Sequence, residues 1–203
     1  LALSPQRFYD LLRNTQDTIG TTSQPAPADF EKTFAFLTEH YQHVVYLALS
    51  SGLSGTMKSA QSALERLRKK GAILIIDSKT VTIGAGLIAR RVVEAVEQGI
   101  KIEALQKLVE SLVDRTKLLI TIPSLEALLR SGRLGRTKGI IARLLKLRPL
   151  LTLNSEGKVI KATMVRGAEK GKAKIISLLQ QKIGCGAQTD FAVAHVDAAA
   201  TGE

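Results

Sequence analysis

Residues 44–76 read VVYLALSSGLSGTMKSAQSALERLRKKGAILII and carry the strongest structural signal in the chain. They contain two short, unbroken apolar runs, 44–49 and 72–76, both rich in branched residues. Such runs are typical of strands that are buried on both faces of a parallel sheet. Between them, apolar residues recur at helical spacing over 56–70, and Gly71 follows as the expected C′ residue. This pattern predicts a strand–helix–strand unit with parallel strands.

The alternation of helices and strands continues toward the C-terminus. Helices are predicted over 84–99 and 102–115, and a strand over 118–122. The polar residues 114–117 interrupt the pattern just before this strand, and two short helical segments are predicted after it, over 124–130 and 140–145.

A hairpin is predicted in the last third of the chain. The strand-like runs 150–153 and 159–162 flank Asn154-Ser155-Glu156-Gly157, a composition that favours a turn between antiparallel strands. One more strand is predicted over 191–195.

The change of pattern near residue 115 predicts two parts. Residues 1–114 would form a parallel-sheet, Rossmann-like α/β domain, and residues 115–203 a smaller α/β domain with antiparallel strands. The chain begins without Met and stops in AAATGE at 198–203, so we expect the second domain to be incomplete.

The composition is that of a folded protein with a basic surface. Of its 203 residues 45% are apolar and 23% charged, which excludes a disordered tail and a fibrous repeat. Lys and Arg number 29 against 18 Asp and Glu, and the resulting net charge of +11 favours an acidic partner. Nucleic acid, anionic lipid, a phosphorylated ligand and an acidic protein face all fit that charge.

The cysteine count and the hydropathy of the chain limit which cellular compartment and which metal sites are expected. Cys185 is the single cysteine, which excludes an intramolecular disulfide and a cysteine-cluster metal site. No pair of histidines or carboxylates stands at metal-ligand spacing. No apolar run approaches the roughly 20 residues that span a bilayer. We therefore expect a cytoplasmic protein with no metal site.

The segment 50–56, SSGLSGT, follows a predicted strand and opens a predicted helix. Hydroxyls, free backbone N–H groups and the helix dipole would converge there on an anion, and the glycines allow a close approach. The segment lacks the ending of a P-loop, the dinucleotide fingerprint and the spacing of a G-x-S-x-G elbow. A tight turn in which Ser54 only caps the helix explains the same residues, and the sequence does not choose between these interpretations.

Other polar residues carry weaker signals. The loop 21–27, TTSQPAP, is typical of a capping or turn segment. Asp77 ends a predicted buried strand, a place where α/β proteins hold ligand groups and also loop caps. His195 follows a predicted strand and is the histidine best placed for a site, whereas His40 and His43 fall near a helix end.

Basic residues concentrate between positions 130 and 148. A solvated face is the ordinary explanation of such a run, and phosphate neutralisation by a nucleic-acid-binding protein is the rival. Aromatic residues make up only 4% of the chain and none interleaves with these charges, which disfavours base stacking. A transient contact with an anionic membrane fits the same charges. The run comprises Arg130, Arg133, Arg136, Lys138, Arg143, Lys146 and Arg148.

Six short motifs follow one another along residues 8–197: Thr22-Ser23-Gln24-Pro25, Leu53-Ser54-Gly55-Thr56, Ile76-Asp77-Ser78-Lys79, Ser131-Gly132-Arg133-Leu134-Gly135, Leu147-Arg148-Pro149-Leu150, and Gly157-Lys158 followed by Arg166. In order and approximate spacing they resemble the DegV family of bacterial fatty-acid-binding proteins. Each motif alone is weak, and the set in register is specific.

The resemblance implies an α/β fold in two parts, with a long-chain fatty acid in the cleft between them. It implies that Thr22 and Ser54 contact the carboxylate and that Gly55 donates a backbone N–H. Family members present the acid to a separate fatty acid kinase, which forms an acyl-phosphate for phospholipid synthesis, and Arg133 and Arg166 would contact that kinase. The further pocket candidates are Ser23, Thr56, Asp77, Ser78 and His195.

The chain departs from the family pattern at both ends. Nothing matches the family's N-terminal strand with its Asp-Ser pair, and the chain stops before the family's His- and Gly-rich C-terminal motif. The expected protein is a cytoplasmic fatty-acid carrier, not an enzyme. Its only ligand would be the fatty acid, no other cofactor and no nucleic acid are expected, and its pocket would be open without the two end segments.

Two other functions stay open on the residues alone. A phosphate- or nucleic-acid-binding protein would use the same loops and predicts a continuous basic face. A hydrolase or transferase would use Ser54 as its nucleophile and predicts a base within hydrogen-bonding reach. A lipid carrier predicts a long apolar tunnel between the two parts.

Overall fold

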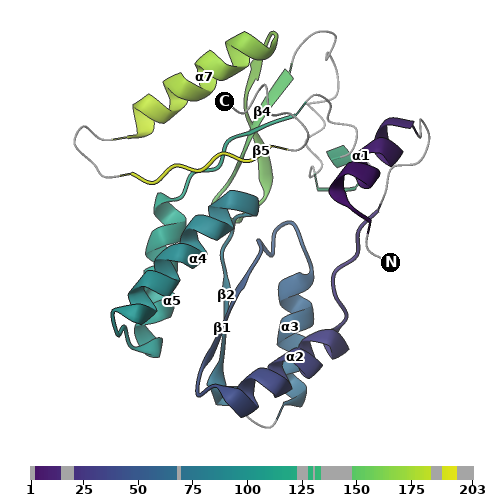
Figure 1. Ribbon diagram of the computed structural model, residues 1–203. Helices are drawn as coiled ribbons and strands as arrows, with labels where there is room; N and C mark the ends of the chain where they lie inside the picture. Colours follow the sequence, from purple (N-terminus) through teal and green to yellow (C-terminus); the bar gives the residue numbers. More distant parts are fainter. Residues whose placement is uncertain are drawn as a thin grey trace.

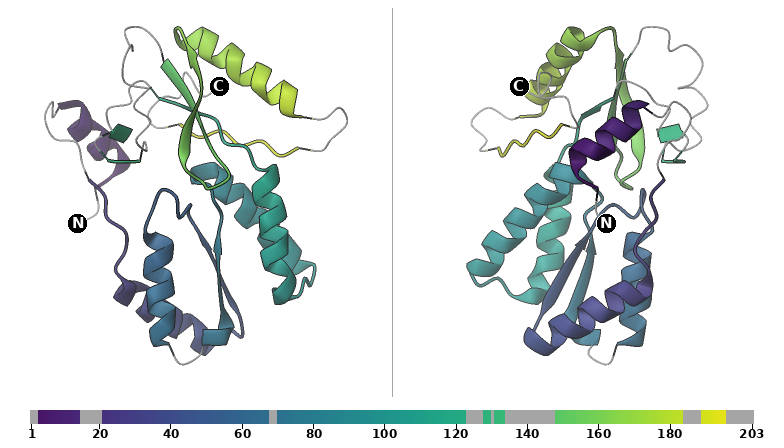
Figure 2. Two further views of the ribbon diagram at one scale, coloured as in Figure 1. Left: turned by 180° about the vertical axis from the view of Figure 1, so that it is seen from behind. Right: turned by 45° about the vertical axis from the view of Figure 1, so that its right-hand side comes forward.

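Two sheets follow one another along the chain, the first with helices on both faces and the second with one helix against it (Figures 1 and 2). The computed structural model describes residues 3–14, 21–67, 70–122, 128–129, 131–133, 148–183 and 189–195. In chain order the elements are α1 (Pro5–Asn14), α2 (Pro27–His40), β1 (Val44–Ala48), α3 (Thr56–Arg66), the 3-10 helix η1 (Lys70–Ala72), β2 (Ile73–Asp77), α4 (Thr82–Glu97), α5 (Ile102–Arg115), β3 (Ile120–Thr121), β4 (Arg148–Leu153), β5 (Val159–Val165) and α7 (Ala168–Lys182).

The first sheet is the predicted parallel pair. β1 and β2 run parallel with Val44 opposite Ile73 and Ala48 opposite Asp77, so the strand–helix–strand unit is confirmed. The predicted end of its helix is wrong, because α3 stops at Arg66 and not near Gly71. Leu67 has extended backbone geometry, with φ −82° and ψ 147°. Its side chain packs against the core that this sheet forms with α2 and α3.

Helices cover both faces of the parallel sheet. On one face Phe34 of α2 and Ala60 of α3 pack against Ile73. On the other face Ile88 of α4 and Val109 of α5 pack against Ile76. Because successive residues of a strand point to opposite faces, this double cover explains why the strand sequences are unbroken apolar runs.

The second sheet contains the predicted hairpin. β3, β4 and β5 pair antiparallel in that order, with Leu153 opposite Val159 across the turn and a bulge between Leu150 and Leu151. Leu151 and Val159 form the core of this sheet, and Leu53, from the loop after β1, packs against them. The mixed α/β class with a parallel and an antiparallel sheet is therefore confirmed.

The remaining predicted elements had mixed outcomes. The helix predicted over 102–115 matches α5, while α4 begins and ends two residues before the predicted 84–99. The strand predicted over 118–122 contracts to Ile120–Thr121. The helix predicted over 140–145 lies outside the described residues, and of the one predicted over 124–130 the structure describes only 128–129, which are helical.

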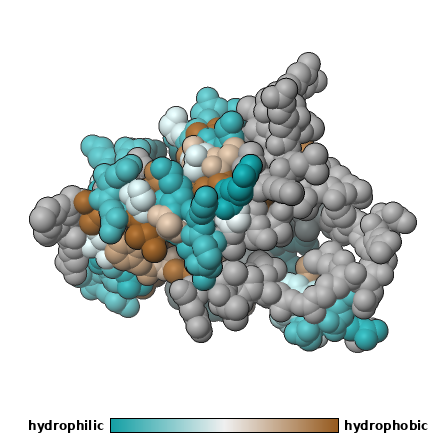
Figure 3. Space-filling view, turned by 90° about the horizontal axis from the view of Figure 1, so that it is seen from above, coloured by the Kyte–Doolittle hydropathy of each residue, from teal (hydrophilic) through white to brown (hydrophobic). Residues whose placement is uncertain are grey.

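α1 and α7 are not among the predicted elements. α7 lies on the antiparallel sheet, and the face of the molecule seen from that side carries hydrophobic side chains scattered among hydrophilic ones (Figure 3).

No helix in the described ranges is long and apolar enough to cross a bilayer.

The strand predicted over 191–195 is wrong. This segment pairs with no strand in the described part of the chain, and Phe191 and Val193 are 59% and 73% exposed. It is instead held to α4 by ion pairs, in which the Asp190 carboxylate lies 2.8 Å from Arg90 and 2.6 Å from Arg91.

Replacing Asp190 with Asn should release this segment from α4. We expect faster amide hydrogen exchange over residues 190–195, with little change in the unfolding midpoint, because ion pairs this exposed contribute little stability. The Asp190–Arg90 hydrogen bond is the main cause that lowers the pKa of Asp190. The contact should therefore be complete above the ordinary aspartate range and be lost as the pH falls through the lowered pKa. The control is Asp114→Asn at the exposed end of α5, and equal exchange in both variants would contradict the assignment.

Candidate functional site

Three loops from different parts of the chain meet around a pocket of about 420 Å³. They are the loop before α2, the loop between β1 and α3, and residues 131–133, which lie between β3 and β4 in the chain. The described lining residues are Thr22, Ser23, Gln24, Gly52, Leu53, Ser54, Gly55, Ser131, Gly132 and Arg133. The parallel pairing of β1 and β2 places the second loop at the carboxyl edge of the sheet, which is where α/β proteins bind ligands.

Most backbone N–H groups of the loop after β1 already have acceptors. Ser51 donates to Asp77, Gly52 donates to the Ser50 hydroxyl, and Leu53 and Ser54 both donate to the Ser50 carbonyl. The N–H of Gly55 has no acceptor among the residues that the structure describes. Among the residues of this loop that line the pocket, it is therefore the backbone donor that remains for a ligand.

The Ser54 hydroxyl lines the pocket and contacts the first residue of α3, whose N-cap residue is Gly55. Its oxygen accepts a hydrogen bond from the backbone N–H of Thr56 at 3.2 Å and lies 2.6 Å from the Thr56 hydroxyl. When the Thr56 hydroxyl donates to Ser54, the Ser54 proton is left for an acceptor in the pocket. Ser54 is therefore not the N-cap residue that the capping interpretation required, although its hydroxyl does accept the N–H of Thr56. Thr56 acts through Ser54 and does not itself line the pocket.

Gln24 joins the first two loops. Its side-chain amide donates to the hydroxyl of Ser59, which is buried on α3, at 3.0 Å. Its carbonyl oxygen lies so close to Gly55 that a Cβ there would approach it to 1.7 Å. Position 55 is therefore glycine for reasons of space, since its φ of −76° is open to any residue.

Arg133 brings positive charge to the pocket. One guanidinium nitrogen lies 3.5 Å from the Thr22 hydroxyl, at the limit of a hydrogen bond, and another donates to the Ser131 carbonyl at 2.9 Å. The structure places Arg133 on the wall of the pocket, and the kinase contact that the family resemblance implies for it stays a prediction.

The other predicted residues lie outside the pocket lining. Asp77 accepts hydrogen bonds from the backbone and hydroxyl of Ser51 and from the backbone of Lys79, so it caps the loops. Ser78 is fully buried, and its hydroxyl donates to the Thr80 carbonyl. His195 is exposed on the segment held by Asp190.

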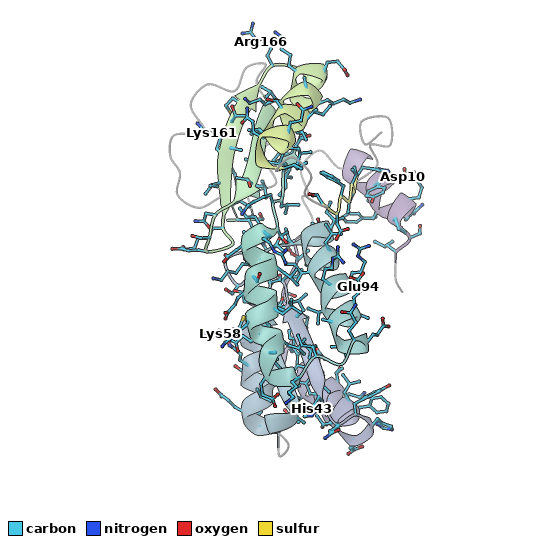
Figure 4. The ribbon with its side chains drawn as sticks, turned by 90° about the vertical axis from the view of Figure 1, so that its left-hand side faces the viewer. Asp10, His43, Lys58, Glu94, Lys161 and Arg166 are labelled. Atoms are coloured by element: carbon cyan, nitrogen blue, oxygen red, sulfur yellow. The ribbon has the colours of Figure 1, made fainter. Side chains whose placement is uncertain are left out.

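Arg166 follows β5 at the far end of the antiparallel sheet, and His43 lies at the opposite end of the molecule (Figure 4).

The lining is mainly polar. Leu53 is the aliphatic member of the described lining set, so this pocket is not the long apolar tunnel predicted for a lipid carrier. Within the described ranges, no cluster of His, Cys, Asp and Glu is suited to a metal ion. The arrangement offers hydroxyls, one N–H and one guanidinium, a set of donors that suits a small anionic group.

Comparison with known families identifies the chain. The family model described as "Uncharacterised protein, DegV family" matches residues 1–202. The chain belongs to the DegV family. A DegV domain-containing protein of Caldanaerobacter subterraneus subsp. tengcongensis is 30% identical over 195 residues, which are 96% of this chain and 68% of that protein.

Solved DegV structures share the fold. A DegV family protein of Thermus thermophilus, described with fatty acid binding, is 31% identical with a TM-score of 0.80 over 89% of this chain and 63% of its own. DegV of Bacillus subtilis, described as a fatty acid binding protein, is 26% identical with a TM-score of 0.76 over 87% and 62%. The chain thus spans 62% to 68% of the length of these three DegV proteins.

Gly55→Ala should destabilise this DegV protein. The new methyl group would displace Gln24 and break its hydrogen bond to Ser59, a loss of about 1 kcal/mol in the free energy of unfolding. Gly86→Ala is the matched control, because a Cβ there meets nothing within 4 Å and α4 should gain about 0.5–1 kcal/mol. Urea unfolding of both variants measures the two changes, and a stabilised Gly55→Ala would contradict the packing described.

Proposed function

We propose that the protein binds a long-chain fatty acid by its carboxylate in this pocket and presents it to a separate fatty acid kinase, which forms the acyl-phosphate. The observation that carries the proposal is the convergence of four donors on one pocket. These are the hydroxyls of Thr22 and Ser54, the free N–H of Gly55 and the guanidinium of Arg133. Fatty-acid binding by the Thermus and Bacillus relatives supports the choice of anion.

The head group and the tail of the ligand would contribute different amounts to the binding free energy. Burial of about 15 methylenes at ~0.8 kcal/mol each gives a gross ~12 kcal/mol before the costs of association. Each hydrogen bond to the charged head contributes only ~1.5–3 kcal/mol. The tail would thus supply affinity, while the head group contacts would select the free acid and orient it.

The pocket is suited to a carrier and not to a catalyst. Around Ser54, the described hydrogen-bond partners are the backbone and hydroxyl of Thr56, and no base that could take its proton is among them. We therefore propose that the protein is not an enzyme. On the family resemblance, we also propose that it acts in the cytoplasm and that Arg133 and Arg166 contribute to the kinase contact. The division into domains 1–114 and 115–203, with the ligand between them, is part of the same proposal.

A phosphate-bearing ligand is the second candidate function. The polar lining and the Arg133 guanidinium favour it, since phosphate oxygens accept hydrogen bonds from the same donors.

Identification of the bound ligand distinguishes the two candidate functions. Native mass spectrometry of protein purified gently from cells, followed by organic extraction, should find about one fatty acid per chain for the carrier. A phosphorylated compound in its place would favour the second candidate. A protein that is empty and takes up no added fatty acid would refute the carrier.

Thr22→Val combined with Ser54→Ala should lower the selectivity for the free acid. Because the two hydroxyls would contact only the head group, we expect the preference for tetradecanoate over tetradecan-1-ol to fall at least about tenfold, with little change in alcohol binding. Isothermal titration with both ligands measures this preference.

The control is Thr33→Val with Ser111→Ala, which removes two hydroxyls from exposed positions on α2 and α5. An unchanged preference in the pocket variant would contradict the carboxylate role of Thr22 and Ser54.

A further inference from the structure

Ser50 lies just beyond the end of β1 and is completely buried. Its N–H donates to the Thr80 carbonyl at 2.9 Å, and its carbonyl accepts from Leu53 and Ser54, each at 3.0 Å. Its hydroxyl accepts from the Gly52 N–H at 3.2 Å and donates to the Gly157 carbonyl at 2.8 Å. One buried residue thus fixes the pocket loop, the loop after β2 and the turn of the antiparallel sheet.

The turn between β4 and β5 fits closely against Ser50. Gly157 has a φ of +72°, and a Cβ there would lie 2.0 Å from the Ser50 hydroxyl oxygen and 2.9 Å from the Lys79 carbonyl. A Cβ on Gly52 would lie 2.6 Å from the Glu156 carbonyl, so the pocket loop touches the turn as well. Asn154 shapes the turn, because its side-chain oxygen accepts from the backbone of Glu156 and of Lys158.

We propose that Ser50 and Gly157 are positioning residues for the carboxylate pocket, although neither lines it. This inference rests on the proposed fatty-acid function. Ser50 occupies the N–H groups of Gly52, Leu53 and Ser54, and so leaves the N–H of Gly55 to face the ligand. The Gly157 carbonyl holds the Ser50 hydroxyl in place, and the antiparallel sheet thereby sets the geometry of a loop that belongs to the parallel sheet.

A positioning role of Ser50 predicts an effect on ligand selectivity that a purely structural role does not. Without the Ser50 hydroxyl, the Gly52 N–H and the Gly157 carbonyl lose their partner, and the loop no longer presents Ser54 and Gly55 in one arrangement. The affinity should therefore fall for ligands that carry a carboxylate. A general loss of stability would instead weaken acid and alcohol alike.

The test compares Ser50→Ala with the wild-type chain by titration with tetradecanoate and with tetradecan-1-ol. We expect the preference for the acid to fall about tenfold in Ser50→Ala. Thr38→Ala is the matched control, because it also removes a buried hydroxyl that donates to a backbone carbonyl, within α2. Its preference for the acid should equal that of the wild type.

A second measurement needs no variant and applies if Ser50→Ala does not fold. In the wild-type chain, tetradecanoate should slow amide hydrogen exchange at Gly157 and Lys158 more than tetradecan-1-ol does. Equal protection by both ligands, or an unchanged preference in a folded Ser50→Ala, would overturn the positioning role while the proposed function stands. A wild-type chain that binds neither ligand would overturn the proposed function, and this inference with it.

Discussion

The parallel pairing of β1 with β2 is the constraint on which the rest of the structure depends. It sets Ala48 opposite Asp77, so the two strands end together and their following loops share one edge of the sheet. Asp77 then accepts hydrogen bonds from Ser51, and Ser50 donates to Thr80, which ties the two loops to each other. A parallel sheet can form only with a crossover between its strands, so α3 and the pocket loop that opens it follow from the same pairing.

At this edge the two sheets contact each other through residues that are close in space and far apart in the sequence. The Ser50–Gly157 hydrogen bond spans 107 residues, and Leu53 packs its side chain into the core formed by Leu151 and Val159. The pocket loop therefore has one face toward a ligand and the other against the second sheet. Hydrogen bonds that are buried in this way are costly to leave unmade, which favours one arrangement of the loop.

The sequence was informative where local patterns are strong. The apolar runs predicted both parallel strands, the periodicity predicted α5, and the turn residues 154–157 predicted the hairpin. The motifs also identified the DegV family, which the family match confirms. The strand predicted over 191–195 failed because its apolar residues have no neighbouring strand in the described chain, a fact that composition does not encode.

What the sequence could not supply was the pairing of distant polar groups. Gln24 stands in a quoted motif, yet only the fold shows that it bonds to Ser59 and covers Gly55. Arg133 belongs to a basic run whose ordinary explanation was a solvated face, and its approach to Thr22 depends on how residues 131–133, between β3 and β4, are placed.

Such contacts make the two walls of the pocket unequal. The Ser54 wall is held by Ser50, Asp77 and Thr56, while the Thr22 wall is exposed and tied down through Gln24 and Arg133. In the proposed carrier, the firmly held wall would fix the carboxylate and the weakly held wall would open for exchange, since parts of a structure with few buried contacts open at the lowest free energy.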